Sequence, residues 1–193
     1  MKLILASASP RRRELLDAAG LKFEVVTSDV EEVRGADEDV DRYVERLALE
    51  KAISVAGRHP AAWVIAADTG VWLEGEVLEK PSDRAHAVAM LGRIAGRQHV
   101  VYTGTALVNE EFGWRRVTVT TTEVEMVKMQ PEEIGWYVDT GEPMDKAGSY
   151  AVQGIGAMFI EAVRGNYTNV VGLPLSTLFA MMRDAGIDPA HYR

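Results

Sequence analysis

Residues 3–16 read LILASASPRRRELL, and they combine a short apolar run, a turn of small residues and the start of a helix. The run from Leu3 to Ala6 has the composition of a buried strand. Ser9 can cap the helix that follows, Pro10 suits its first position, and Gly20 can end it. A strand that turns directly into a helix indicates an α/β protein.

The rest of the chain adds further strands and helices. Residues 61–67, AAWVIAA, form a continuous apolar run and predict a strand buried on both faces. Helical spacing of apolar residues between 40 and 55 predicts a long amphipathic helix. Residues 98–109 and 114–129 predict an antiparallel pair that turns around 110–113. The remaining expected elements are a strand at 23–27, a strand pair at 71–81, a helix from a cap at Ser82 to Gly96, a helix at 131–138, a strand at 157–163 and a helix at 174–185. We therefore expect an α/β domain with a mixed sheet.

The composition is that of an acidic globular protein. The 193 residues carry a net charge of −8 and give a pI near 5.1. We expect no binding to nucleic acid, because that affinity comes mainly from Lys and Arg on phosphate. There is no cysteine, and no apolar stretch reaches the ~18 residues that a membrane helix needs. We expect a cytoplasmic protein with no membrane partner and one domain over residues 1–193, in which two lobes can flank a cleft.

Three consecutive arginines, Arg11 to Arg13, stand at the first turn of the first helix. Cations are unfavourable there, because the helix dipole is already positive, whereas an anion would be stabilised. The Ser7 hydroxyl adds a donor, and consecutive helical residues point about 100° apart. We therefore predict an anion site that two of the arginines face, with Arg13 on the far side and paired with an acid. The alternative is a solvated helix start.

Two acidic positions are candidates for metal binding or proton transfer. Asp68 follows the apolar run, at the carboxyl edge where α/β sheets place ligand chemistry. Glu32 lies in the most acidic loop and can complete a Mg²⁺ site with Asp68, since magnesium binds through one or two carboxylates and substrate phosphates. The alternatives are a turn-forming aspartate and a solvated loop.

Two lysines are candidates for phosphate binding. Lys51 follows Leu47 by four residues and is therefore expected on the core side of its helix, where the presence of a charged side chain requires an explanation. Lys80 lies just beyond a predicted strand and before Pro81. Either can contact phosphate as a point charge. For each one alone, the alternative is a lysine that reaches out to solvent.

Several common motifs are absent from the sequence. GxxxxGK[ST] does not occur, no GxGxxG follows the first strand, and no GxSxG is present. The four histidines lack the spacing of a zinc site. An anionic ligand would have to be bound locally, by clustered cations or a metal.

Together these stretches resemble the Maf family over nearly the whole chain. The similar segments, beside Glu32, are LILASASPRRRELL, LALEKA, AADT, LEKP, DKAGSYAVQG and GNYTNVVGLPLS. The resemblance implies a Maf/inosine-triphosphatase-like α/β fold, with a mixed, elongated central sheet flanked by helices and an active-site cleft. It also implies a cytoplasmic nucleoside triphosphate pyrophosphatase that uses a divalent cation, Mg²⁺ or Mn²⁺. Family members are often homodimers.

The resemblance also implies roles for single residues. Asp68 would be the catalytic base, and Glu32 with Asp68 would hold the metal. The phosphate-binding residues would be Ser7, Arg12, Lys51 and Lys80.

Three positions indicate the branch of the family that acts on dTTP and UTP. That branch carries the residues found here at Arg11, Thr69 and Gln153, which would set substrate specificity. A glutamine amide offers both a donor and an acceptor, which can pair with the O4 and N3–H edge of uracil or thymine. The expected reaction is hydrolysis of dTTP, UTP or modified pyrimidine triphosphates to the monophosphate and pyrophosphate. The rival hypothesis is a non-catalytic, nucleotide-sensing regulator of cell division.

Overall fold

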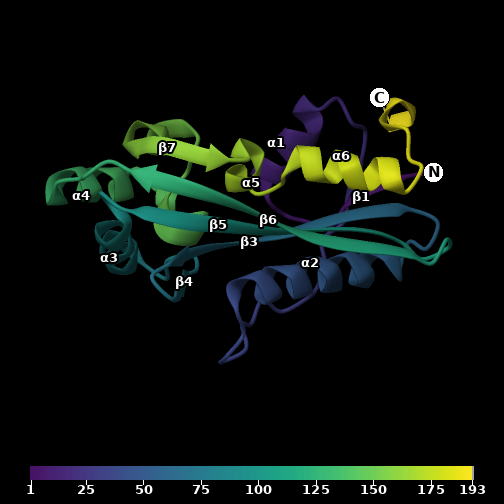
Figure 1. Cartoon of the computed structure of the whole chain (residues 1–193), viewed down its shortest axis with the longest axis horizontal. Coiled ribbons are helices and arrows are strands. Elements are labelled where there is room, and N and C mark those ends of the chain that lie inside the picture. Colours follow the sequence, from purple (N-terminus) through teal and green to yellow (C-terminus); the bar gives the residue numbers. More distant parts are fainter. Residues whose placement is uncertain (193) are drawn as a thin grey trace. The chain divides into compact units, whose positions relative to one another are not determined.

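The computed structural model describes residues 1–192 (Figure 1). Its strands are β1 (Leu3–Leu5), β2 (Glu24–Val25), β3 (Trp63–Leu73), β4 (Glu76–Leu78), β5 (Gln98–Asn109), β6 (Trp114–Met126) and β7 (Ile160–Gly165). Its α-helices are α1 (Pro10–Ala18), α2 (Val40–Ala56), α3 (Arg84–Ile94), α4 (Pro131–Asp139), α5 (Tyr167–Val171) and α6 (Leu175–Asp184). Its 3₁₀ helices are η1 (Glu142–Asp145), η2 (Ala147–Ser149), η3 (Gly154–Phe159) and η4 (Pro189–Tyr192).

Over the described residues, the strands form one seven-stranded mixed sheet in the order β2-β1-β3-β5-β6-β7, with β4 paired to β3. β1 lies parallel to β2 and β3, whereas β4 and β7 run antiparallel to their partners. The three longest strands have 11, 12 and 13 residues, about twice the usual length. The predicted mixed, elongated sheet flanked by helices is confirmed.

The chain divides into two compact units. The first contains Met1–Asp68, Thr103–Thr120 and the chain from Gly172 onward, and the second contains Thr69–Tyr102 and Thr121–Val171. The first unit therefore holds α1, α2, α6 and the parallel strands, and the second holds α3, α4 and β7.

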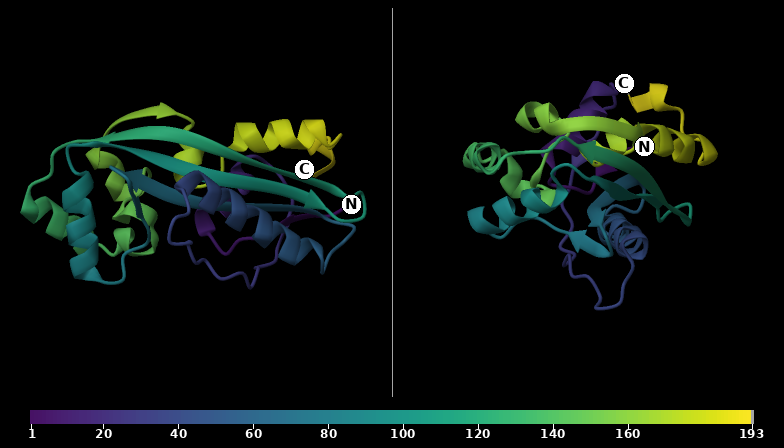
Figure 2. Two further views of the ribbon diagram at one scale, coloured as in Figure 1. Left: turned by 60° about the horizontal axis from the view of Figure 1, so that its bottom comes forward. Right: turned by 60° about the vertical axis from the view of Figure 1, so that its left-hand side comes forward.

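In the first unit, α2 covers one face of the sheet and α6 covers the other (Figures 1 and 2). Alternate strand residues supply the α2 side of this core, because successive side chains of a strand point to opposite faces. They pack against a stripe of small residues on α2. The strand residues are Ile4, Ala6, Val64, Ala66, Ala106 and Val108, and the helix residues are Ala48, Ala52, Val55 and Ala56. Small side chains on both surfaces allow the helix to lie close to the sheet.

Gly104 of β5 allows the closest approach of α2. A Cβ atom at this position would lie 2.1 Å from the backbone oxygen of Val44 and 3.0 Å from the backbone nitrogen of Glu45. Only glycine fits between the strand and the helix backbone at such a distance.

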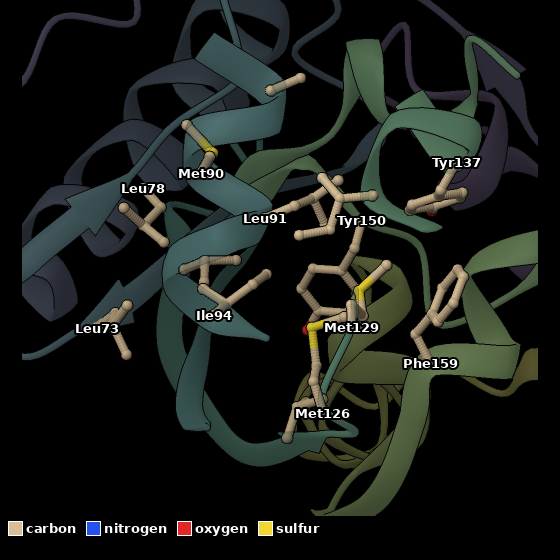
Figure 3. Packing of buried hydrophobic residues seen from close by; sticks show 14 of the residues in the cluster. Leu73, Leu78, Met90, Leu91, Ile94, Met126, Met129, Tyr137, Tyr150 and Phe159 are labelled. Atoms are coloured by element: carbon tan, nitrogen blue, oxygen red, sulfur yellow. The ribbon is translucent and has the colours of Figure 1, made fainter. Parts of the chain in front are cut away.

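In the second unit, α3, α4 and the strands enclose a core rich in methionine and aromatic residues (Figure 3). Met126 and Met129 lie beside the ring of Tyr150, and Met90 lies nearer to Leu78 in the same core. Thioether side chains suit such irregular spaces, because they are flexible and polarisable.

Most predicted elements are confirmed, and several predictions are wrong in detail. The strand expected at 23–27 covers only Glu24–Val25, and the strand expected at 114–129 ends at Met126. The strand expected at 61–67 begins only at Trp63 and continues to Leu73 as β3, because β4 pairs with Val71 to Leu73 and holds the second half of the strand extended. Asp83 caps α3 in place of Ser82, since its carboxylate accepts the His86 backbone N–H. Of residues 157–163, the first three belong to η3, and β7 begins only at Ile160.

Between residues 1 and 192, none of the helices is both long enough and apolar enough to span a membrane.

Candidate active site

Asp68 lies on the face of the sheet that α2 covers. Val64 and Ala66 already point to that face, and two further residues along the strand bring Asp68 to it. Its side chain is buried, with 7% of its surface exposed. The prediction that Asp68 ends its strand is wrong, since β3 continues to Leu73. The paired part of β1 ends at Leu5, opposite Ile65, so Asp68 nevertheless lies beyond the end of its parallel neighbour.

Lys51 approaches Asp68 from α2. It lies three residues after Ala48 and four before Val55, so it belongs to the buried stripe of the helix and is 5% exposed. Its Nζ donates to Asp68 Oδ1 at 2.6 Å and to Glu32 Oε1 at 2.5 Å. The prediction that Lys51 leans toward the core is confirmed. A buried ammonium is costly unless charged partners surround it, and here two carboxylates do.

Glu32 reaches the site from the loop between β2 and α2, and 49% of its side chain is exposed. Its backbone oxygen accepts a hydrogen bond from the Tyr43 hydroxyl at 3.4 Å. The loop thus brings a half-exposed carboxylate to the same ammonium as buried Asp68.

Arg46 of α2 fixes the conformation of this loop. Its guanidinium makes two 2.7 Å hydrogen bonds with the Glu38 carboxylate, and Nη2 also donates to the Val33 backbone oxygen at 3.0 Å. The bond from Arg46 lowers the pKa of Glu38 to about 2, so the pair stays charged at neutral pH. Val33 follows Glu32 directly, and the network therefore holds the backbone beside Glu32.

The turn between β1 and α1 contributes Ser7, and the first turn of α1 contributes Arg12. Arg12 Nη1 donates to Ser7 Oγ at 3.1 Å, and Arg12 Nε donates to the Gly172 backbone oxygen at 2.8 Å. Ser7 Oγ also accepts the Ser9 backbone N–H at 3.2 Å. Ser9 is the N-cap residue of α1, as predicted, but its side chain makes no capping bond. The turn therefore holds one guanidinium and one hydroxyl at the start of the helix.

Burial and charge act on these groups together. Burial raises the pKa of Asp68, while the positive charges of Lys51 and Arg12 oppose the rise. Burial lowers the pKa of Arg12, and the carboxylates of Asp68 and Glu32 act in the other direction. Arg12 therefore lies within electrostatic range of both carboxylates. The cluster brings two carboxylates, of Glu32 and Asp68, together with the cationic side chains of Lys51 and Arg12. Such a partly buried arrangement suits proton transfer beside an anionic ligand.

The three arginines differ in their surroundings. Arg13 is exposed and lies 3.7 Å from the Asp17 carboxylate one turn later, so the predicted pairing with an acid is confirmed. Arg13 lines the same hollow as Ser7, so its predicted position on the far side stays a prediction. Arg11 is partly buried, and its charge lowers the pKa of Arg12.

Five of the predicted site residues, Ser7, Arg12, Glu32, Lys51 and Asp68, belong to the first unit and interact there. Thr69, Lys80 and Gln153 belong to the second unit. Thr69 follows Asp68 within β3, Lys80 is exposed, and Gln153 is partly buried. Their roles stay predictions.

Sequence reasoning missed two residues that shape the site. Gly104 sets the closeness of α2, and an isolated glycine within a strand pattern signals such an approach. Arg46 orders the Glu32 loop, but a partner eight residues away across a loop without periodicity gives no sequence signal.

Comparisons with known proteins identify the family of this chain. A protein named "dTTP/UTP pyrophosphatase" from Syntrophus aciditrophicus is 49% identical over 185 residues, which cover 96% of this chain and 90% of that one. One of the same name from Myxococcus xanthus is also 49% identical, with 96% and 93% covered. The structure of the Staphylococcus aureus Ham1 protein aligns with a TM-score of 0.50 at 16% identity, over 83% of this chain and 80% of that chain, and this likeness concerns the fold alone. The family model described as "Maf-like protein" matches residues 2–185. The chain therefore belongs to the Maf family.

Proposed function

We propose that this chain hydrolyses dTTP and UTP between the α- and β-phosphates, releasing the nucleoside monophosphate and pyrophosphate. Modified pyrimidine triphosphates belong to the same substrate class. The names of the relatives support the reaction. The main structural support for this reaction is the contact between the buried side chains of Lys51 and Asp68. It places a carboxylate that can act as a base next to a cation, and the Glu32 carboxylate contacts the same cation.

Asp68 is the proposed general base. Burial raises its pKa, and a carboxylate with a raised pKa accepts a proton from water more readily. Lys51 Nζ fixes one carboxylate oxygen, which leaves the other to orient the attacking water. The proton then moves from the water to Asp68 as the new oxygen bond to the α-phosphorus forms. The bond from the α-phosphorus to the bridging oxygen breaks, and pyrophosphate leaves with that oxygen.

Cationic and polar groups stabilise the negative charge of the triphosphate and of the leaving pyrophosphate. Arg12 is held in place by Ser7 and Gly172, so its guanidinium needs little reorganisation to meet phosphate oxygens. The Ser7 oxygen accepts two bonds, which leaves its O–H to donate to a phosphate. Lys51 and Lys80 complete the proposed phosphate-binding set.

The carboxylates fit a divalent cation. Glu32 and Asp68 each place an oxygen within 2.6 Å of the Lys51 ammonium, so the two carboxylates reach one region and would hold Mg²⁺ or Mn²⁺ there together with substrate phosphates. Among residues 1–192, no group of three or more His, Cys, Asp or Glu could hold a metal. Two carboxylates with substrate phosphates are a usual magnesium environment. The bound ion would neutralise part of the polyphosphate charge.

The second unit supplies the proposed specificity residues Thr69 and Gln153, with Arg11 from the first. Their match to the dTTP and UTP branch supports the role, and the Gln153 amide can pair with the O4 and N3–H edge of the base. A cytoplasmic location, a homodimer, a single domain over residues 1–193 and an active-site cleft stay predictions from the family resemblance.

A product assay tests the proposed function. Purified protein is incubated with dTTP and Mg²⁺, with and without a chelator, and dTMP and pyrophosphate are measured. We expect both products in equal amounts and their loss with chelator. Binding of dTTP without products would favour the rival nucleotide-sensing regulator, and orthophosphate would indicate a phosphomonoesterase.

Asp68→Asn tests the base. The variant should fold and lose ~10²-fold or more in turnover, the scale expected for removal of a general base. Asp41→Asn is the matched control, because Asp41 is an exposed carboxylate at the start of α2 and should leave turnover unchanged. Turnover of Asp68→Asn close to that of the unmodified protein would contradict the assignment.

A further inference from the structure

Glu142, at the start of η1, forms a hydrogen-bond network with the segment that carries Gln153. Its Oε1 accepts the Tyr137 hydroxyl at 2.8 Å and the Gly156 backbone N–H at 2.8 Å. Its Oε2 accepts the Ile155 backbone N–H at 3.0 Å. One carboxylate thus receives three hydrogen bonds, two of them from the backbone immediately after Gln153.

Tyr137 of α4 extends the network to the other side of Gln153. Its hydroxyl oxygen accepts the Ala151 backbone N–H at 3.1 Å while its proton goes to Glu142. The backbone is therefore fixed two residues before Gln153 and two residues after it. Both of these backbone N–H groups are bound by the same pair of side chains, the Glu142 carboxylate and the Tyr137 phenol.

Two glycines allow the segment to lie directly on this pair. A Cβ atom at Gly154, where φ is +66°, would lie 2.4 Å from Glu142 Oε2. A Cβ atom at Gly156 would lie 2.4 Å from the Tyr137 hydroxyl oxygen. The close packing and the hydrogen bonds select the same backbone conformation.

The charge state of Glu142 suits this task. Partial burial acts to raise its pKa, but the bonds from Gly156, Ile155 and Tyr137 outweigh burial, and the pKa is lowered. The ionised carboxylate, which only accepts, is thus the form that the network binds. Burial raises the pKa of Tyr137, so the phenol keeps the proton that it donates.

We propose that Glu142 and Tyr137 are positioning residues that fix Gln153 for selection of the pyrimidine base. The inference rests on the proposed function, in which the Gln153 amide reads the base. An amide distinguishes uracil from cytosine only when its oxygen and nitrogen face the base in a fixed orientation, because cytosine presents an amino donor where uracil and thymine present an acceptor. A surface segment needs supporting hydrogen bonds to hold such an orientation.

Glu142→Gln tests the inference through substrate discrimination. The amide keeps the shape of the carboxylate but presents an N–H₂ group to backbone donors. We expect KM for UTP to rise roughly tenfold, the effect of one or two lost charge-assisted hydrogen bonds, while kcat changes less than about twofold. The ratio of kcat/KM for UTP over CTP should fall by a similar factor. Tyr137→Phe, which removes only the hydroxyl, should shift the ratio in the same direction.

Asp139→Asn is the matched control. Asp139 ends the same helix as Tyr137, is exposed and pairs with Arg84, so its replacement should leave both KM and the UTP/CTP ratio unchanged. Amide hydrogen exchange of Ile155 and Gly156 should quicken in Glu142→Gln and stay unchanged in the control, since only the former loses their acceptor.

A double variant separates a positioning role from a general structural one. In a Gln153→Ala background, Glu142→Gln should cause no further loss of discrimination, because the residue that it positions is already gone. An unchanged UTP/CTP ratio in both Glu142→Gln and Tyr137→Phe, or fully additive losses in the double variant, would overturn the inference. Should Glu142→Gln not fold, Tyr137→Phe and its double variant with Gln153→Ala decide. Unmodified protein that releases no dTMP and pyrophosphate would instead refute the proposed function itself.

Discussion

At the scale of single residues, the candidate site is organised around one ammonium group. Lys51 Nζ lies between Glu32 and Asp68, and without it two carboxylates would be held close together with one of them buried. Removing one partner of a buried ion pair leaves the other charge uncompensated, which costs far more than the pair contributes. Lys51 therefore brings the two carboxylates together. In the proposed reaction it also provides positive charge for a phosphate.

The surroundings of the arginines predict unequal effects of their removal. Arg12→Ala should lower kcat/KM for dTTP by ~10²-fold, because Arg12 is fixed by Ser7 and Gly172 and lies in range of Asp68. Arg13→Ala should change it by less than about twofold, since Arg13 pairs with Asp17 on the exposed side. Steady-state kinetics of both variants with dTTP provide the measurement. The reverse order of effects would show that the assignment of the two arginines is wrong.

Single residues of the site were predictable where a local rule applied to them. The spacing of Lys51 to Leu47 predicts the core side of its helix, and Lys51 is buried there. The bridge from Lys51 to both carboxylates was not predictable, because it depends on how closely α2 lies on the sheet. The role of Arg46 depends likewise on the path of an irregular loop.

At the scale of elements, the approach of α2 to β3 and β5 sets the distance from Lys51 to Asp68. The helix presents a stripe of alanines, and β5 presents Gly104 where the backbones are closest. The position of Lys51 along α2 then places its side chain opposite Asp68 of β3. Any change that lifts the helix from the sheet should weaken the contact between them.

Gly104→Ala tests this dependence. The added methyl group would overlap the Val44 backbone, so α2 must move, at a cost of about 1–3 kcal/mol in the free energy of unfolding. We also expect lower turnover, because Lys51 moves with the helix. Urea unfolding and product release measure the two effects.

Gly92→Ala is the matched control for this substitution. Gly92 lies inside α3, and a Cβ atom there would meet nothing within 4 Å. Alanine should raise stability slightly at this position, since it favours the helix. Equal stability and turnover in Gly104→Ala and the unmodified protein would show that the helix is not held as closely as described.

At the scale of the whole molecule, each of the two compact units contains a group whose pKa its surroundings lower. His99 is buried in the second unit with 2% of its surface exposed, and its Nε2 lies 2.8 Å from the Tyr150 hydroxyl. Burial lowers the pKa of His99 to about 4. In the first unit, Glu38 has a pKa of about 2 because of its bond from Arg46. The two groups therefore affect stability in different ranges of pH.

His99 should make the second unit less stable as the pH falls from about 6.5 to about 4. In this range the unfolded chain binds a proton that the folded unit does not, so the free energy of unfolding decreases, by about 3 kcal/mol in all. Glu38 loses its contribution only below its ordinary pKa of 4.5. Hydrogen exchange of the second unit's core amides between pH 6.5 and 4.5 provides the measurement.

His99→Gln should reduce this pH dependence, because an amide can still accept from Tyr150 but does not titrate. His191→Gln is the control, since His191 is exposed in the first unit and its replacement should leave the dependence unchanged. The same pH dependence in His99→Gln and in the unmodified protein would contradict the assignment to His99.

The fold class was predictable from the sequence, whereas the extent of its strands was not. Alternating strands and helices in the first half and strand pairs in the middle predicted a mixed sheet, and the sheet is mixed. The apolar run at 61–67 predicted only half of β3, because the polar Asp68 and Thr69 interrupt the pattern at the point where one unit meets the next along the chain. Pairing with β4, and not local preference, keeps the later residues extended.

The alternation of side chains along β3 also determines which genetic changes the site can tolerate. Val64, Ala66 and Asp68 share a face because they are separated by steps of two residues. One codon gained or lost between Val64 and Asp68 would turn every later side chain to the opposite face, so that the carboxylate would point away from Lys51. In the loop that carries Glu32, side chains do not alternate between two faces, so one added or lost residue does not reverse the direction of all later side chains. In the history of this gene, insertions and deletions should therefore gather in that loop and avoid this part of the strand.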